Sequence, residues 1–221
     1  MNGSPDGRAR ALRIAFFDPI QWDYVVETPR TKPLGGSQSS LCYLAEALAK
    51  RGHEVTLINQ TTTPCRSCGV DCLNYKQVPI DRFSFYDAII FFNMASHRTV
   101  RQIRSGAGSR TPILLWSQHN PDEGAVKELA DPATHDVYDG FVLVSKWQAQ
   151  GYQDAFGIKP ERMRVLGNAI GPVFENGLPM ARSAAFFMTT RWQSQGTPSR
   201  NASSRPMEQL PGFVAVTTAP G

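Results

Sequence analysis

Two adjacent glycines form the first group of residues that could do chemistry. Gly35 and Gly36 precede an amphipathic segment, and Ser37 follows them directly. Free backbone N–H groups at the start of a helix can bind a phosphate, and glycine lets the ligand approach closely. We therefore predict that Gly35, Gly36 and Ser37 bind a phosphate-bearing substrate; the alternative is a tight turn that needs two glycines. No third glycine follows at the spacing of a dinucleotide-binding motif.

Two polar positions directly after apolar runs are further candidates. His119, with Asn120 beside it, follows the apolar run 113–116, and Asn168 follows the run 163–166. A histidine at a strand end is suited to contact a reacting group, although backbone carbonyls can equally satisfy an imidazole there. We expect His119 to be catalytic and Asn120 and Asn168 to bind substrate, with a turn as the other interpretation of Asn168.

Three cysteines have a spacing that zinc sites also use. Cys65, Cys68 and Cys72 form C-x2-C-x3-C in a predicted loop, and Cys42 could supply a fourth ligand. No second pair of cysteines or histidines with the spacing of zinc ligands follows in the sequence. Reduced thiols are also ordinary in a cytoplasmic chain. We therefore expect no metal.

The apolar runs define the elements that must position these residues. They are continuous rather than alternating, which is typical of strands buried on both faces of a parallel sheet. The sequence thus predicts a doubly wound, mostly parallel α/β domain with ligands at the carboxyl ends of its strands. The predicted strands are 12–17, 54–59, 88–92, 113–116, 141–144 and 163–166.

Helix signals lie between the predicted strands. The leucine and alanine spacing over residues 41–48 predicts an amphipathic helix with Ser37 as its N-cap and Gly52 just after its end. Further helices are predicted at 122–129 and at 146–156, the latter capped by Ser145 and stopped by Gly157. Residues 18–34 form an unusually long predicted loop.

The predicted domain is residues 12–176, after a flexible N-terminus at 1–11. Residues 177–221 contain no lysine or aspartate and show no periodicity, so we expect a disordered tail or a non-native end such as a shifted reading frame produces. Of the net charge of +4, the four arginines and one glutamate of this tail supply +3. The remaining charge does not indicate a nucleic-acid partner.

No membrane span or signal peptide is predicted. The longest apolar stretch, residues 88–95, is much shorter than the roughly 20 residues that a spanning helix needs. We therefore expect a cytoplasmic protein, which leaves association with a membrane surface open.

Taken together, these motifs resemble the amino-terminal half of the family 4 (group 1) glycosyltransferases. The resemblance covers about residues 13–175 and rests on the glycine pair, the strand-end histidine and three short segments: Arg51-Gly52-His53-Glu54-Val55, Val144-Ser145 and Val165-Leu166-Gly167-Asn168. It implies one half of a GT-B fold, in which a Rossmann-like acceptor domain faces a donor domain that holds a nucleotide sugar. It also implies retaining transfer without a metal or other cofactor, the nucleotide sugar being a co-substrate.

By this resemblance, Gly35 and Gly36 approach the donor diphosphate, His119 contacts the donor sugar, and the loop 18–34 shapes the acceptor site. Asn168-Ala169 stands where the family usually has Asn-Gly, and neither the family's E-x7-E element nor its basic pair for the diphosphate is found. We therefore expect the acceptor-side part of a glycosyltransferase, inactive alone, whose partners are a nucleotide-sugar donor and a sugar or glycan acceptor. The alternatives are a non-enzymatic sugar- or nucleotide-binding module and a fragment of a sugar-nucleotide epimerase.

Overall fold

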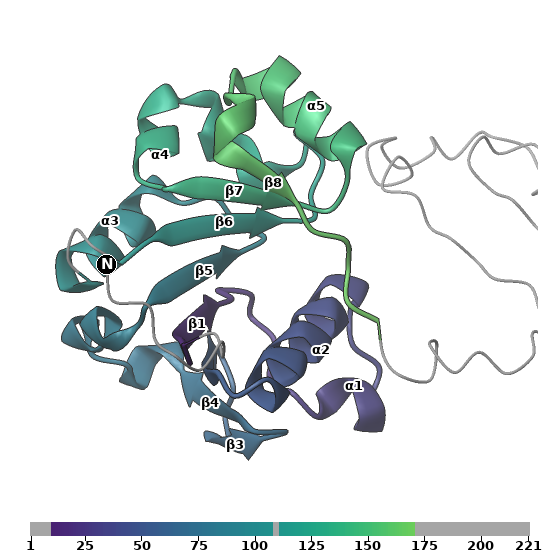
Figure 1. Cartoon of the computed structure of the whole chain (residues 1–221), viewed down its shortest axis with the longest axis vertical. Helices are drawn as coiled ribbons and strands as arrows, with labels where there is room; N and C mark the ends of the chain where they lie inside the picture. Colours follow the sequence, from purple (N-terminus) through teal and green to yellow (C-terminus); the bar gives the residue numbers. More distant parts are fainter. Residues whose placement is uncertain (1–9, 108–110, 171–221) are drawn as a thin grey trace, which may run out of the picture. The chain divides into compact units, whose positions relative to one another are not determined.

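The computed structural model describes residues 10–107 and 111–170. Within them, one eight-stranded sheet has the order β3-β4-β2-β1-β5-β6-β7-β8 (Figure 1). Only β3 and β4 pair antiparallel; every other neighbouring pair is parallel. The strands are β1 (Arg13–Phe17), β2 (Glu54–Asn59), β3 (Cys65–Ser67), β4 (Val70–Asn74), β5 (Ala88–Phe92), β6 (Ile113–Ser117), β7 (Gly140–Leu143) and β8 (Met163–Val165). The predicted α/β class with a mostly parallel sheet is confirmed.

The direction of strand addition reverses at β1. The chain passes from β1 outward to β2 and β4, and then returns to the other side of β1 for β5. Strand β1 therefore pairs with both, Phe16 lying opposite Leu57 in β2 and opposite Ile90 in β5. In sheets of this topology, ligands bind at the carboxyl ends of the strands near the reversal.

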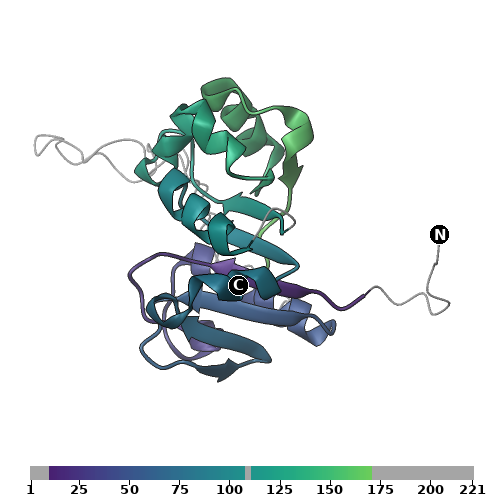
Figure 2. The ribbon, with the colours of Figure 1, turned by 90° about the vertical axis from the view of Figure 1, so that its left-hand side faces the viewer.

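Helices cover both faces of the sheet, as the continuous apolar strands require. In β1, Ile14 and Phe16 pack with the buried residues of α2, whereas Ala15 and Phe17 pack with those of α3 and α5. Both views show β1, in purple, in the middle of the sheet (Figures 1 and 2). The α-helices are α1 (Thr28–Thr31), α2 (Gly36–Lys50), α3 (His97–Ala107), α4 (Pro132–Asp136) and α5 (Lys146–Phe156). The 3-10 helices are η1 (Tyr75–Gln77), η2 (Ile80–Phe85), η3 (Gly124–Ala130) and η4 (Pro160–Arg162).

Local capping explains where α2 ends. Gly52 has φ +91°, its N–H donates to Ala49 O over 3.0 Å, and the N–H of His53 donates to Leu48 O over 3.2 Å. These two bonds satisfy carbonyls that the helix leaves free, so the predicted glycine stop is confirmed. The predicted N-cap is wrong by two residues: Gly35 is the N-cap, and Ser37 lies inside the first turn.

Helix α5 begins and ends as predicted. Ser145 is its N-cap and accepts a 3.0 Å hydrogen bond from the N–H of Gln148. Gly157 ends the helix with φ +68°, a conformation that glycine adopts without a steric penalty.

Several local predictions differ from the structure. Residues 65–74, including the three cysteines expected in a loop, contain the antiparallel strands β3 and β4. The segment 122–129, predicted as an α-helix, largely forms the 3-10 helix η3. Helix α3 was not predicted, because it contains few apolar residues; of its side chains at residues 97–106, Val100 and Ile103 are the buried apolar ones. The long loop 18–34 is present, interrupted only by the four-residue helix α1.

Some predictions fall outside the described residues. These are the tail 177–221, the domain end at residue 176 and residues 1–9 of the N-terminal segment. In the part of the chain that the structure does describe, the helices all lack the length and apolar content needed to cross a membrane.

Gly106 in α3 lies against the backbone of η2. A Cβ atom there would be 1.9 Å from the carbonyl oxygen of Ile80. Alanine favours a helix over glycine by about 1 kcal/mol, but this overlap forces α3 and η2 apart at a cost of about 3 kcal/mol. We expect Gly106→Ala to lower the free energy of unfolding by about 2 kcal/mol in urea denaturation.

The control for this prediction is Gly36→Ala, because a Cβ atom at Gly36 meets no atom within 4 Å. Its unfolding free energy should stay within about 0.5 kcal/mol of the unsubstituted protein. Equal stabilities for the two variants would contradict the close approach of α3 to η2.

Candidate functional site

The predicted site residues lie at the carboxyl ends of parallel strands or on the helix that follows one. His119 and Asn120 follow β6, Asn168 follows β8, and Gly35, Gly36 and Ser37 lie at the start of α2, the second helix after β1. Because parallel strands end at the same edge of a sheet, the topology places all of these residues along one edge.

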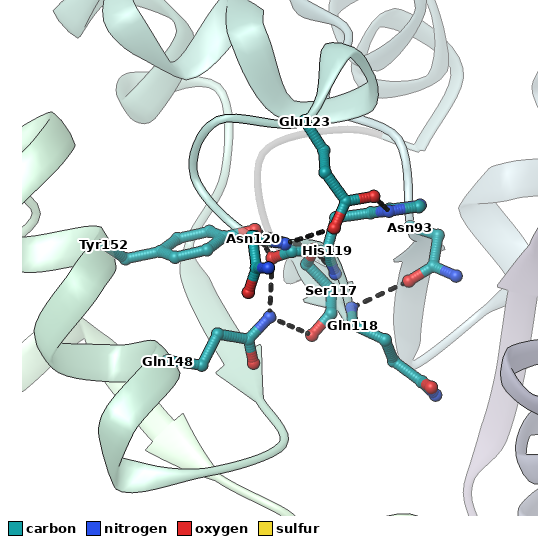
Figure 3. Close-up of polar contacts among 8 residues, drawn as sticks. All are labelled: Asn93, Ser117, Gln118, His119, Asn120, Glu123, Gln148 and Tyr152. Carbon is teal, nitrogen blue, oxygen red and sulfur yellow. Dashed lines mark hydrogen bonds and ion pairs between the residues drawn. The ribbon is translucent and has the colours of Figure 1, made fainter. Parts of the chain in front are cut away.

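A tight turn folds the chain after His119 back toward its ring. The N–H of Glu123 donates to Asn120 O over 3.1 Å, and Pro121 lies at the second position of this turn, where proline is favoured. The turn brings Glu123 Oε2 to 2.5 Å from His119 Nδ1, while Glu123 Oε1 accepts a 2.8 Å bond from the N–H of Asn120 (Figure 3). With Nδ1 engaged and the side chain 30% exposed, Nε2 is the ring nitrogen left for a ligand.

Helix α5 holds the backbone of the same segment. Gln148 Nε2 donates to Ser117 O (3.1 Å) and to His119 O (2.8 Å), and its Oε1 accepts from the N–H of Val144 (2.8 Å). The hydroxyl of Tyr152, one turn further along α5, lies 2.7 Å from Ser117 Oγ and 3.0 Å from His119 O (Figure 3). Burial raises the pKa of Tyr152, so its phenol stays protonated and can donate. The position of His119 is therefore set from a second element.

Gln118 connects the ends of three strands. Asn93, which follows β5 with φ +59°, accepts a 2.8 Å bond from the N–H of Gln118 through its side-chain oxygen. Asn168 Nδ2 donates to Gln118 Oε1 over 3.2 Å, and the N–H of Ala169 donates to Ser40 Oγ in α2 over 3.0 Å. The structure thus brings Asn168 to the residue before His119, and the segment after β8 to α2.

Two buried donors near the end of β6 have no hydrogen-bond partner. Among the described residues these are Trp116 Nε1 and Gln118 Nε2, and Trp116 is only 1% exposed. Unpartnered buried donors are rare in folded proteins. Both donors lie in or directly after β6, and the described residues leave them unpaired.

The start of α2 is open at Gly36 and covered at Gly35. A Cβ atom at Gly35 would be 2.9 Å from the ring of Trp22 and 3.1 Å from Gln38 Oε1, whereas one at Gly36 would meet nothing within 4 Å. The first α-helical bond of α2 runs from the N–H of Ser39 to Gly35 O, so the N–H groups before it stay outside the helical ladder. Together with the helix dipole, these groups favour an anion at Gly36 and Ser37.

A buried carboxyl group anchors the loop 18–34 beside α2. Asp18, 1% exposed, accepts hydrogen bonds from the Tyr24 hydroxyl (2.5 Å), Gln38 Nε2 (3.3 Å) and the N–H of Ile20 (3.3 Å). Burial raises the pKa of Asp18, and these three hydrogen bonds oppose part of that rise. The loop expected to shape an acceptor site is thus tied to the helix expected to bind phosphate.

The cysteines do not form a metal site in the structure. Cys65 is exposed, whereas Cys42 and Cys72 are buried in the core on the α2 side of the sheet. Burial raises the pKa of Cys72 to about 11 and that of Cys42 further, which disfavours the thiolates that zinc requires. Across residues 10–107 and 111–170, no group of three or more His, Cys, Asp or Glu side chains could hold a metal ion.

Three residues that contact His119 were not singled out from the sequence: Glu123, Gln148 and Tyr152. A signal for Gln148 existed, because Ser145-x-x-Gln148 is a capping-box pattern. Ser145 Oγ accepts from the N–H of Gln148, and Gln148 Oε1 accepts from the N–H of Val144, the residue before the N-cap. Proline two residues after His119 similarly indicates the turn that returns Glu123. Nothing local in the sequence marks Tyr152, which reaches the site because α5 packs beside β7 and β8.

Comparison with known proteins identifies the fold. No protein-family model and no curated protein match the sequence. A glycosyltransferase from Rickettsia africae ESF-5 has a similar solved structure, with a TM-score of 0.50 and 12% identity over 76% of this chain and 46% of that chain.

Two other solved structures give lower TM-scores. HepE of Anabaena, in complex with UDP-glucose, has a TM-score of 0.44 and 14% identity over 72% of this chain and 44% of its own. WaaG, a glycosyltransferase involved in lipopolysaccharide biosynthesis, has a TM-score of 0.45 and 16% identity over 76% of this chain and 49% of its own. At these identities the likeness concerns the fold alone. The chain spans about half the length of these proteins. Its α/β fold is consistent with one half of a GT-B fold, as the likeness to the Rickettsia structure indicates.

Proposed function

We propose that this chain supplies the acceptor-side half of a retaining, nucleotide-sugar-dependent glycosyltransferase similar to family 4. One observation carries the proposal: two suitable groups share the edge of the sheet near β1, where the direction of strand addition reverses. These groups are the start of α2, where no atom covers Gly36, and the imidazole of His119, which Glu123 holds in place. The glycosyltransferase-like fold over about half of a longer enzyme supports it.

Each part of this edge suits one part of a nucleotide-sugar reaction. When the sugar leaves its nucleoside diphosphate, negative charge grows on the phosphate oxygens, and the N–H groups at Gly36 and Ser37 are placed to stabilise it. Positive charge grows on the sugar ring, which the lone pair of an imidazole stabilises through a sugar hydroxyl. Asn120 and Asn168 supply polar groups for the sugar, and the loop anchored by Asp18 shapes the site of the acceptor.

Gly36 permits a direct test, because Gly36→Ala fills the proposed phosphate position without a clash in the fold. Adding UDP-glucose or GDP-mannose to the ¹⁵N-labelled chain, up to about 10 mM to reach weak binding, should shift the amide signals of Gly36 and Ser37. In Gly36→Ala the shifts at residue 36 and at Ser37 should fall about fivefold at equal ligand concentration, a loss of about 1 kcal/mol.

The matched control is Gly124→Ala. Gly124 also begins a helix, η3, and a Cβ atom there also meets nothing within 4 Å. This variant should respond to the nucleotide sugars like the unsubstituted chain. Unchanged Gly36 and Ser37 signals, or equal responses from both variants, would reject the phosphate site and with it the proposed function.

A further inference from the structure

Both carboxylate oxygens of Glu123 have a defined partner. Oε2 lies 2.5 Å from His119 Nδ1, and Oε1 accepts the N–H of Asn120 over 2.8 Å. The Glu123 side chain is 18% exposed, and the short turn from Asn120 to Glu123 fixes where its backbone begins. The carboxylate therefore has little freedom to change partners.

We propose that Glu123 is a positioning residue that fixes the tautomer of His119. A carboxylate can only accept hydrogen bonds, so the proton of the neutral imidazole must be on Nδ1. The lone pair is then on Nε2, the nitrogen that has no partner in this pair. His119 consequently presents a hydrogen-bond acceptor, and the ligand group that it fits is a donor such as a sugar hydroxyl. The choice of a sugar rests on the proposed function; the tautomer does not.

Glu123→Gln should reverse the polarity of His119 without changing the shape of the site. The glutamine side chain has one accepting oxygen, and the fixed backbone N–H of Asn120 can only donate. The oxygen must therefore face Asn120, which leaves the NH₂ group to face Nδ1 of His119. Nδ1 then has to accept, so the proton moves to Nε2.

A matched control is available in the 3-10 helix η3, which begins directly after Glu123. Glu128 Oε2 accepts a 2.8 Å hydrogen bond from the backbone N–H of His97, so Glu128→Gln makes the same chemical change beside another histidine's backbone. It should leave the tautomer of His119 as it is in the unsubstituted chain.

The tautomers can be read directly by long-range ¹H–¹⁵N correlation on the full chain with ¹⁵N-labelled histidine. The spectra are recorded in the pH range where the ¹⁵N shifts of His119 no longer change with pH, so that its imidazole is neutral, and its signals are assigned by their loss in His119→Gln. We expect the Nδ1–H tautomer in the unsubstituted chain and in Glu128→Gln, and the Nε2–H tautomer in Glu123→Gln.

An Nε2–H tautomer or an averaged mixture of tautomers in the unsubstituted chain would overturn the proposal. This measurement does not depend on whether any variant folds. An unchanged Nδ1–H tautomer in a folded Glu123→Gln would overturn it as well. Since no nucleotide sugar is added, these outcomes are separate from those of the Gly36 experiment. A failed tautomer assignment leaves the phosphate site in place, and a failed phosphate site leaves the tautomer in place.

Discussion

Replacing His119 by alanine should lower the turnover of a two-domain enzyme containing this chain by about 100-fold or more. A group that meets charge developing in the transition state is worth about 2.7 to 4 kcal/mol, or 10² to 10³ in rate. The substitution should lower kcat/KM and leave the fold unchanged. Gln148 donates to the carbonyl oxygen of His119, and it can donate to the same backbone oxygen of alanine.

The control for His119→Ala is His53→Ala. His53 lies just before β2, at the opposite edge of the sheet, where its Nδ1 accepts a 3.2 Å bond from the N–H of Leu12. Steady-state kinetics should show His53→Ala within about twofold of the unsubstituted enzyme, a difference below 0.5 kcal/mol. A loss below threefold in a folded His119→Ala enzyme would remove His119 from the mechanism.

The 221-residue chain by itself should transfer no sugar and should bind a nucleotide sugar only at about millimolar concentration. The resemblance assigns the basic pair for the diphosphate and a carboxylate for the ribose to the other half of the enzyme. Charge-assisted hydrogen bonds contribute roughly 1.5 to 3 kcal/mol each, so their loss costs on the order of 5 kcal/mol. That weakens a micromolar donor to about millimolar or beyond.

The start of α2 cannot compensate for this loss. Its N–H groups and dipole contribute about 1 kcal/mol at an exposed position such as Gly36. Calorimetric titration with several nucleotide sugars, together with an assay for donor hydrolysis, measures both parts of the prediction. Micromolar binding, or hydrolysis that follows the chain through purification, would show that the 221 residues contain a complete donor site.

Elements with local signals were predicted closely. The apolar runs predicted β2 and β5 at their observed bounds, and β1 to within one residue. Gly52, Ser145 and Gly157 cap helices as predicted, because each cap depends on only a few consecutive residues. The same locality explains why the sequence could place His119 at the edge of the sheet, since a polar residue shortly after a buried strand lies there; its catalytic role stays a prediction.

Elements that depend on distant partners were missed or misassigned. The strands β3 and β4 are three and five residues long, and β4 is held in place by pairing with β2. Helix α3 has few apolar residues, and its position depends on packing against η2, which the glycine at 106 permits. Neither the pairing of β4 with β2 nor the packing of α3 against η2 produces a periodic pattern in the local sequence.

The site divides in the same way. The apolar runs were enough to predict where the buried strands end, and hence that His119, Asn168 and the Gly35-Gly36 pair share one edge of a parallel sheet. Tertiary structure decided what each of them contacts: Glu123 at the His119 ring, Gln148 and Tyr152 at its backbone, and Gln118 at Asn168. The physical reason is that strand burial and helix capping are properties of neighbouring residues, whereas a hydrogen bond between two loops or between a loop and a helix exists only after the sheet has brought them together.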